Sequence, residues 1–337
     1  MSRRLRGFVA AGAALLLLVT AGAAAVVWRN TYDLREERVV IPDGPRSLDG
    51  VLALPAAGRG PYGLVVFVHG DGPVDATHDG FYRPIWEAFA HAGYASLSWN
   101  KPGVAGSKGD WLGQSMEDRA REVTAAVAWA RGRPGLDGRR IGLWGASQAG
   151  WVMPKVAART PDLRFVIAVS PAINWLRQGR YNLLAELGAE GASPATVQAR
   201  LERSETTRSL LRRGATFEEY RAEVGDTGDM TEARWGFILR NHTVDATEDL
   251  SRVRVPTLLV LAGHDLNVDV ADTETTYRAS PAPLWVRRYP GADHALLREE
   301  VAGSEIRAVL TALFAPRDLF ADGFLADQAG FLRREIG

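Results

Sequence analysis

A serine lies at the turn between a predicted strand and a predicted helix, and its neighbours are small. Ile141–Trp144 is an apolar run typical of a buried strand, Trp151–Ala158 can form a helix, and Gly-Ala-Ser-Gln-Ala-Gly (145–150) joins them. A strand, a sharp turn and a helix with serine at the apex are what a nucleophile elbow requires. Ala149 stands where a second glycine is usual. The pattern predicts Ser147 as a nucleophile, and the alternative is an ordinary strand-to-helix turn with closely packed small residues.

A serine hydroxyl becomes a good nucleophile only when a base takes its proton and an acid orients that base. In a strand–helix architecture of this kind the three groups follow in the order serine, acid, histidine. His294 is the only one of the six histidines in a glycine-containing loop after the last predicted strand. Asp265 closely follows the preceding strand, whereas Asp269 stands at a helix start and can serve as its N-cap. The prediction is a triad of Ser147, Asp265 and His294.

Acyl transfer also needs backbone N–H groups aimed at the developing oxyanion. Gln148, directly after the serine, is expected to supply one of them, and Asp71 in His-Gly-Asp-Gly-Pro (69–73) the other. The Asp71 carboxylate must then point away from the oxyanion. His69 is expected to support this loop without doing chemistry. The aromatic residues near these segments are expected to form pocket walls, with plain core packing as the alternative; they are Trp111, Trp151, Trp175 and Tyr181.

Strands and helices alternate along most of the chain, which predicts a mostly parallel sheet with helices on both faces. The continuous apolar run Leu64–Val68 is typical of a strand covered on both sides. The alternation stops from 171 to 253, where helical stretches carry many arginines and glutamates, as solvated helix faces do. We therefore expect an α/β core from 31–170 and 254–337, with 171–253 as an inserted helical cap.

Residues 1–30 form a targeting or anchoring segment by their pattern. Arg3, Arg4 and Arg6 precede the uncharged run Phe8–Val27, which has 20 residues, enough to span a bilayer. The segment is either an uncleaved membrane anchor or a cleaved signal. Both predict a basic N-terminus in the cytoplasm and a domain on the other side of the membrane.

Composition excludes several classes of function. The 337 residues carry 40 basic and 40 acidic side chains, so the chain has no basic excess to attract nucleic acid. The absence of cysteine excludes disulfides, thiolate metal sites and a cysteine nucleophile. We expect no metal or organic cofactor, and the sequence carries no signal of oligomeric state.

The loop at 69–73, Lys101-Pro102-Gly103 and the elbow at 145–150, followed by Asp265 and His294, together resemble the α/β-hydrolases. The likeness is to esterases and acyl-CoA thioesterases near the dienelactone hydrolase and prolyl oligopeptidase families. This resemblance implies an α/β-hydrolase fold, an inserted cap and acyl transfer to water from a small-molecule ester or thioester. A serine peptidase and an acyltransferase share the same fold and triad. A binding module on an inactive hydrolase fold is the alternative from another class.

Overall fold

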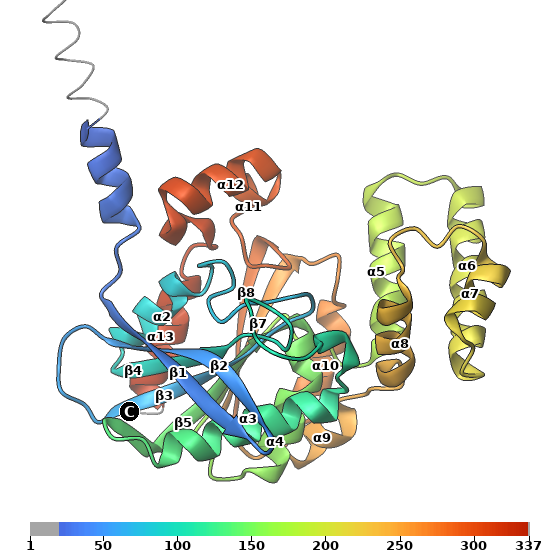
Figure 1. The fold of residues 1–337 in the computed structure, drawn as a ribbon. Coiled ribbons are helices and arrows are strands. Elements are labelled where there is room, and N and C mark those ends of the chain that lie inside the picture. Colours follow the sequence, from blue (N-terminus) through green and yellow to red (C-terminus); the bar gives the residue numbers. More distant parts are fainter. Residues whose placement is uncertain (1–19, 336–337) are drawn as a thin grey trace, which may run out of the picture.

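The structure, a computed structural model, describes residues 20–335 and places their eight strands in one sheet (Figure 1). The strand order is β1-β2-β4-β3-β5-β6-β7-β8, and of these strands only β2 runs against the others. The predicted mostly parallel sheet is therefore confirmed. The strands are β1 (Leu34–Asp43), β2 (Arg46–Pro55), β3 (Tyr62–Val68), β4 (Tyr94–Trp99), β5 (Leu136–Ala146), β6 (Val166–Val169), β7 (Thr257–His264) and β8 (Leu284–Asp293).

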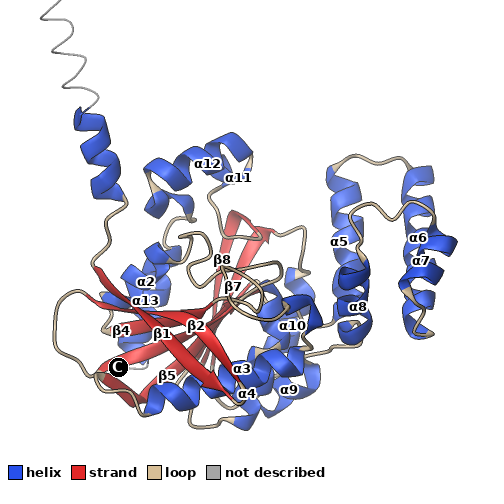
Figure 2. Cartoon of the chain, viewed as in Figure 1, coloured by secondary structure: helices blue, strands red, loops and turns tan. Residues whose placement is uncertain are grey.

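Side chains alternate across the sheet and build a core on each face. In β3, Leu64 and Val66 join one core while Val65 and Phe67 join the other. The first core includes residues of α3, α4, α9 and α10, and the second includes residues of α2 and α13. Both faces are therefore covered by helices (Figure 2). These helices are α2 (Arg83–Ala90), α3 (Met116–Arg131), α4 (Met153–Arg159), α9 (Thr247–Arg252), α10 (Val270–Arg278) and α13 (Phe324–Glu335).

Of the five helices between β6 and β7 in the sequence, the first four, here called the inserted helices, stand beside the sheet (Figure 1). The last three of these helices share a small core of their own, in which Tyr220 stacks on Trp235 with ring centroids 4.3 Å apart and Leu210 is buried. Most of their other side chains are at least partly exposed, as expected from their charge. They are α5 (Trp175–Ala189), α6 (Pro194–Arg212), α7 (Phe217–Val224) and α8 (Glu232–Asn241).

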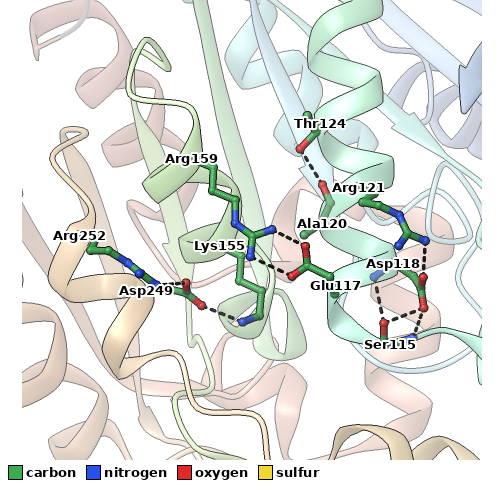
Figure 3. A network of polar contacts seen from close by, with 10 residues as sticks. All are labelled: Ser115, Glu117, Asp118, Ala120, Arg121, Thr124, Lys155, Arg159, Asp249 and Arg252. Atoms are coloured by element: carbon green, nitrogen blue, oxygen red, sulfur yellow. Dashed lines mark hydrogen bonds and ion pairs between the residues drawn. The ribbon is translucent and has the colours of Figure 1, made fainter.

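Ion pairs join three of the helices that pack on the first core (Figure 3). Arg159 of α4 pairs with Glu117 of α3, and Lys155 Nζ of α4 lies 2.8 Å from Asp249 Oδ2 of α9. Arg252 also binds Asp249, which is buried. The helix that follows the predicted nucleophile is thus tied to its neighbours on both sides.

The C-terminal region after β8 contains two short helices in place of one continuous helix. The chain forms α11 (Glu299–Ala302) and α12 (Glu305–Phe314), separated at Gly303. The break occurs because the Ser304 hydroxyl accepts a hydrogen bond from the N–H of Arg307 and starts a new helix. The helix that packs on the sheet is α13, which buries Phe331 and Leu332.

The expected anchor or signal in 1–30 lies largely outside the described residues. Residues 20–29 are helical in the structure. Within 20–335, no helix is both long and apolar enough to cross a membrane.

Candidate active site

Ser147 follows β5 directly and has a backbone φ of +55°, in the left-handed region that residues other than glycine rarely adopt. The turn continues as a 3-10 helix (η2, Ser147–Trp151) before α4 begins. A side chain at Gly145 would place its Cβ 2.6 Å from the Cβ of Ala149 and 2.8 Å from the oxygen of Val68. The turn therefore tolerates alanine at 149 because residue 145 is glycine. The backbone at Ser147 has the strain of a nucleophile elbow.

Gly150 provides the second close approach in this turn. A Cβ there would lie 2.4 Å from the oxygen of Ala172 and 2.6 Å from its nitrogen. The N–H of Ala172 also donates to the backbone carbonyl oxygen of Ser147 at 3.0 Å. The segment after β6 thus packs directly on the turn. Gly150, one position after the place where the second glycine is usual, makes room for this contact.

Asp265 and His294 come from the loops after β7 and β8 and meet directly. Nδ1 of His294 lies 2.9 and 2.8 Å from the two carboxylate oxygens of Asp265, whose side chain is fully buried. The N–H groups of Asn267 and Val268 donate to the same carboxylate at 2.9 and 2.8 Å. Because a carboxylate accepts, Nδ1 carries the proton and Nε2 is left as the basic nitrogen.

Asp269, the alternative acid, has a different role. Its carboxylate accepts from the N–H groups of Ala271 and Asp272 at 3.0 and 3.1 Å and caps α10. This local use of the side chain explains why Asp265, rather than Asp269, pairs with the histidine.

Ser147 and His294 line one cavity of about 490 Å³. Within the described part of the chain they make no direct hydrogen bond, a contact that in hydrolytic sites often tightens only when substrate binds. The cavity is also lined by Gly70 and Asp71 and, from α5, by Gln178 and Asn182. The serine, the histidine and the loop at 69–73 therefore face the same space.

The loop at 69–73 lies against the elbow and is held there by Lys101. A Cβ on Gly70 would lie 3.5 Å from the oxygen of Ala146 and 3.7 Å from Ser147 Cβ. Nζ of Lys101 donates to the oxygens of Gly70 and Gly72 at 2.6 and 2.7 Å. Burial, with a smaller contribution from the Arg119 charge, lowers the pKa of Lys101 well below its usual range. The two carbonyls are thus directed away from the cavity by a buried lysine.

Arg119 of α3 joins the same loop to the elbow. One of its guanidinium nitrogens donates to the side-chain oxygen of Gln148, and the other donates to the oxygen of His69 at 2.5 Å. Arg119 is 6% exposed, and burial lowers its pKa although Glu122 opposes the shift. Arg119 was not predicted as a site residue from the sequence. Its signal was an arginine on the apolar face of Met116–Arg131, at helical spacing from Val123.

His69 supports the loop, as expected. Its Nε2 donates to the oxygen of Trp99 at 2.5 Å, so Nδ1 accepts from the Tyr82 hydroxyl at 3.0 Å. Burial lowers the pKa of His69 well below its usual range, so the ring stays neutral. Both ring nitrogens are occupied by these structural bonds.

The Asp71 carboxylate is directed to α8. Two nitrogens of Arg234 donate to its two oxygens at 3.0 and 2.5 Å. Burial raises the pKa of Asp71, but the hydrogen bonds and charge of Arg234 outweigh it, and the net pKa is lowered. This pair connects the inserted helices to the loop that carries the expected oxyanion N–H.

The expectation that four aromatic residues form the pocket wall is wrong: none of them lines the cavity, and the three tryptophans follow the alternative of core packing. Trp151 is buried and stacks on Trp175 with centroids 4.6 Å apart, and Trp111 packs edge-on against Phe237 at 5.6 Å. They pack in the first core or against it. Tyr181 donates its hydroxyl to the backbone oxygen of Asp265 at 2.8 Å and thereby supports the acid loop. The aromatic residues that do line the cavity are Phe81, Tyr82, Trp144 and Phe324.

One group of side chains is close enough to share a metal ion within the described residues: Asp33, Glu87 and His91. Both carboxylate oxygens of Glu87 accept hydrogen bonds from Arg317 at 2.6 and 2.7 Å. Arginine therefore already supplies the positive charge there. None of these residues lines the cavity of Ser147.

The sheet order, the strained serine after β5 and the Asp265–His294 pair define an α/β-hydrolase with a serine-type site. The family model described as "Serine aminopeptidase, S33" (Hydrolase_4) matches residues 59–301. The chain belongs to this family of serine hydrolases. No curated protein matches the sequence significantly.

Solved structures with the same fold include several esterases. The Pyrococcus furiosus esterase Pf2001 has 17% identity and a TM-score of 0.56, and the match covers 90% of this chain and 92% of the other. Est1E from Butyrivibrio proteoclasticus, solved with ferulic acid, has 15% identity and a TM-score of 0.56 over 88% and 97% of the two chains. A dienelactone hydrolase from Anabaena variabilis has 18% identity and a TM-score of 0.50 over 84% and 98%. At these identities the likeness establishes the fold.

Proposed function

We propose that the protein hydrolyses a carboxylic ester or thioester through an acyl-enzyme on Ser147. The observation that carries the proposal is a histidine hydrogen-bonded to the buried Asp265: His294 lines one cavity together with a serine in left-handed backbone geometry. A neutral imidazole with Nδ1–H bound to a carboxylate leaves Nε2 free to take a proton from a hydroxyl.

In the proposed reaction the Ser147 hydroxyl gives its proton to Nε2 of His294 as Oγ bonds to the acyl carbon. The carbonyl oxygen becomes an oxyanion that accepts hydrogen bonds from the N–H groups of Gln148 and Asp71. The intermediate collapses, the bond to the leaving group breaks, and His294 returns the proton to that group. Water then repeats the sequence: His294 takes its proton, its oxygen attacks the acyl carbon, and Ser147 leaves with the proton.

The cavity favours an ester or thioester over an aminopeptidase substrate. A free amino terminus calls for a carboxylate partner in the site. Asp71 is the only carboxylate among the described residues that line the cavity, and Arg234 occupies both of its oxygens. Comparison of a p-nitrophenyl ester with an aminoacyl p-nitroanilide tests this preference, and faster turnover of the anilide would favour the peptidase. An acyltransferase would be recognised by faster product formation when an alcohol or amine acceptor is added.

The test of the nucleophile is a fluorophosphonate label with Ser147→Ala. The variant should lose labelling and nearly all turnover of p-nitrophenyl butyrate, while its circular dichroism is unchanged. Ser170→Ala is the matched control, because Ser170 also ends a strand with a positive φ of 39°. Labelling that survives in Ser147→Ala, or that is lost only in Ser170→Ala, would contradict the assignment of Ser147 as the nucleophile.

We further propose that the inserted helices form a cap over this site and that residues 1–30 export the domain. The contacts of α5 with the acid loop support the cap: Asn182 Nδ2 donates to the Leu266 oxygen at 3.1 Å. The sequence Arg3 to Val27 supports export. Protease added to intact cells should degrade the domain if it lies outside the cytoplasm, and should leave it intact if it does not.

A further inference from the structure

Helix α12 carries its apolar side chains outward. Ile306, Val309, Leu310 and Leu313 follow one another at the spacing of a single helix face, and they are 75, 57, 49 and 56% exposed. Phe314 extends the same face and is 49% exposed. None of the ten residues of α12, all of which the structure describes, is buried. This helix therefore presents an apolar surface, and Ala308 is its one hydrophobic residue that packs against the second core.

An amphipathic helix in a water-facing position normally turns its polar side outward. Contiguous exposed apolar surface on a soluble domain marks a place where something else binds. Here the inward-facing positions of α12 are small or polar, such as Ala308 and Thr311, and the large apolar side chains are the outer ones. The sequence of α12 thus favours an apolar environment outside the domain.

The chain's N-terminal helix lies next to this face. The side chain of Asn30 donates to the oxygen of Leu313 at 2.9 Å, and Arg29 pairs with Asp318 at 3.2 Å. Val27 and Trp28 are 66 and 76% exposed. Figure 1 shows the helix at 20–29 and α12 extending from the same side of the molecule.

The sequence that precedes this point identifies the occupant. From Val27 back to Phe8 no residue is charged, and the run ends in Trp28-Arg29, a pair typical of the boundary between lipid and water. The apolar run therefore joins the domain at the position where α12 exposes its apolar face. A single lipid surface can accommodate both.

We propose that α12 and residues Val27 and Trp28 form a lipid-docking surface, with the apolar face of α12 lying in the headgroup region of a bilayer. An interfacial helix of this kind lies parallel to the membrane and buries bulky apolar residues at the boundary with the acyl chains. The domain is then fixed in orientation by two contacts. A second copy of the chain and the protein's own residues 1–19 are the competing occupants.

The chain has no cysteine, so one introduced cysteine gives a unique probe site. Val309→Cys labelled with NBD reports on α12, and Ala199→Cys, exposed on α6, is the matched control. The full-length proteins are reconstituted into vesicles of phosphatidylcholine and phosphatidylglycerol at a ratio of three to one. Lipids with a doxyl group near the headgroup quench a probe that lies at that depth.

The expected result is a blue-shifted Val309 probe that doxyl lipid quenches at least about threefold more than the Ala199 probe. Adding Leu310→Asp and Leu313→Asp should return the Val309 probe to the level of the control, and both positions are exposed enough to keep the fold. Equal, weak quenching of the two probes overturns the proposal. Disulfide formation between two unlabelled Val309→Cys chains, with no lipid quenching of the labelled protein, indicates a second copy and also overturns it. A Val309 probe that is blue-shifted yet insensitive to doxyl lipid assigns the face to residues 1–19 and also overturns it.

Discussion

Arg119 and Gln148 are joined by a buried hydrogen bond that connects α3 to the turn carrying the proposed nucleophile. The same guanidinium holds the oxygen of His69, two residues before Asp71. Each of the two backbone N–H groups proposed for the oxyanion therefore belongs to a segment positioned by one arginine. Arg119 does not touch the reacting atoms, so it is a positioning residue.

We predict that Arg119→Lys lowers kcat for p-nitrophenyl butyrate by about tenfold to a hundredfold with little change in KM. The single ammonium of lysine cannot bind the oxygens of both Gln148 and His69 as the guanidinium does. The oxyanion N–H groups then lose their positions, and this loss raises the energy of the transition state more than that of the bound substrate. Steady-state kinetics measure the split between kcat and KM. Arg121→Lys is the control on the same helix, because Arg121 is exposed and pairs with Asp118. Equal rates for the two variants would contradict the positioning role.

Asp265→Asn should lower kcat by about three to four orders of magnitude while the protein stays folded. An amide in this place can donate to Nδ1, and the imidazole then presents the wrong tautomer to Ser147. Asp269→Asn is the comparison, since Asp269 caps α10 and asparagine is also a good N-cap. The measurement is kcat with p-nitrophenyl butyrate for both variants. A large loss of kcat in Asp269→Asn, and not in Asp265→Asn, would assign the acid to Asp269.

We predict that the Asp71–Arg234 pair contributes to the free energy of unfolding and that this contribution is lost at acidic pH. The pKa of Asp71 is lowered in the folded protein, so the carboxylate binds protons more weakly there than in the unfolded chain. The pair stabilises the fold fully above the ordinary carboxyl pKa of about 3.9, and this contribution is lost as pH falls below it. Urea unfolding between neutral pH and pH 3 should show a shallower decline for Asp71→Asn than for the wild type. The difference should shrink in high salt, because the Asp71 side chain is 41% exposed. Parallel curves at low salt would contradict this role.

Phe81 and His78 line both the Ser147 cavity and a neighbouring cavity of about 830 Å³. Phe81 packs against Phe320 with ring centroids 4.9 Å apart. We predict that Phe81→Ala joins the two spaces and raises kcat/KM for p-nitrophenyl decanoate relative to the butyrate. Each extra methylene that becomes buried is worth about 0.8 kcal/mol, so the ratio should change by tenfold or more. Phe217→Ala, in α7, should leave the ratio unchanged. An unaltered chain-length profile in Phe81→Ala would show that the acyl group does not reach this wall.

The periodicity of apolar residues was enough to predict the parallel sheet and most helices, because burial on one or two faces leaves a local signature. The apolar run at 64–68 became β3, and the helical stretches expected within 171–253 became the inserted helices. The same pattern placed Ser147, Asp265 and His294 after the ends of three predicted strands, and parallel strands bring their carboxyl ends to one edge. The likeness to the α/β-hydrolases then reduced the possible parallel α/β folds to one.

Other features depended on contacts that no local pattern encodes. Trp111, Trp151 and Trp175 were expected at the cavity and instead pack in the core or against it, because a tryptophan near a site in sequence can point to either side of its element. The helix at 305–314 has the periodicity of a core helix, yet its apolar face turns away from the domain. An amphipathic pattern specifies that one face is apolar, but not what that face contacts.

By itself, the sequence determined the strands, the helices, the chain order of the proposed catalytic groups and the lack of any cysteine chemistry. Only the tertiary structure showed that Asp265 contacts His294 directly, that Lys101 and Arg119 hold the loop at 69–73, and that Arg234 binds the Asp71 carboxylate. The physical reason is the range of the interactions. The spacing of apolar residues and the capping of helices involve near neighbours in the chain. Each of these polar contacts joins residues at least 29 positions apart, which only packing brings together.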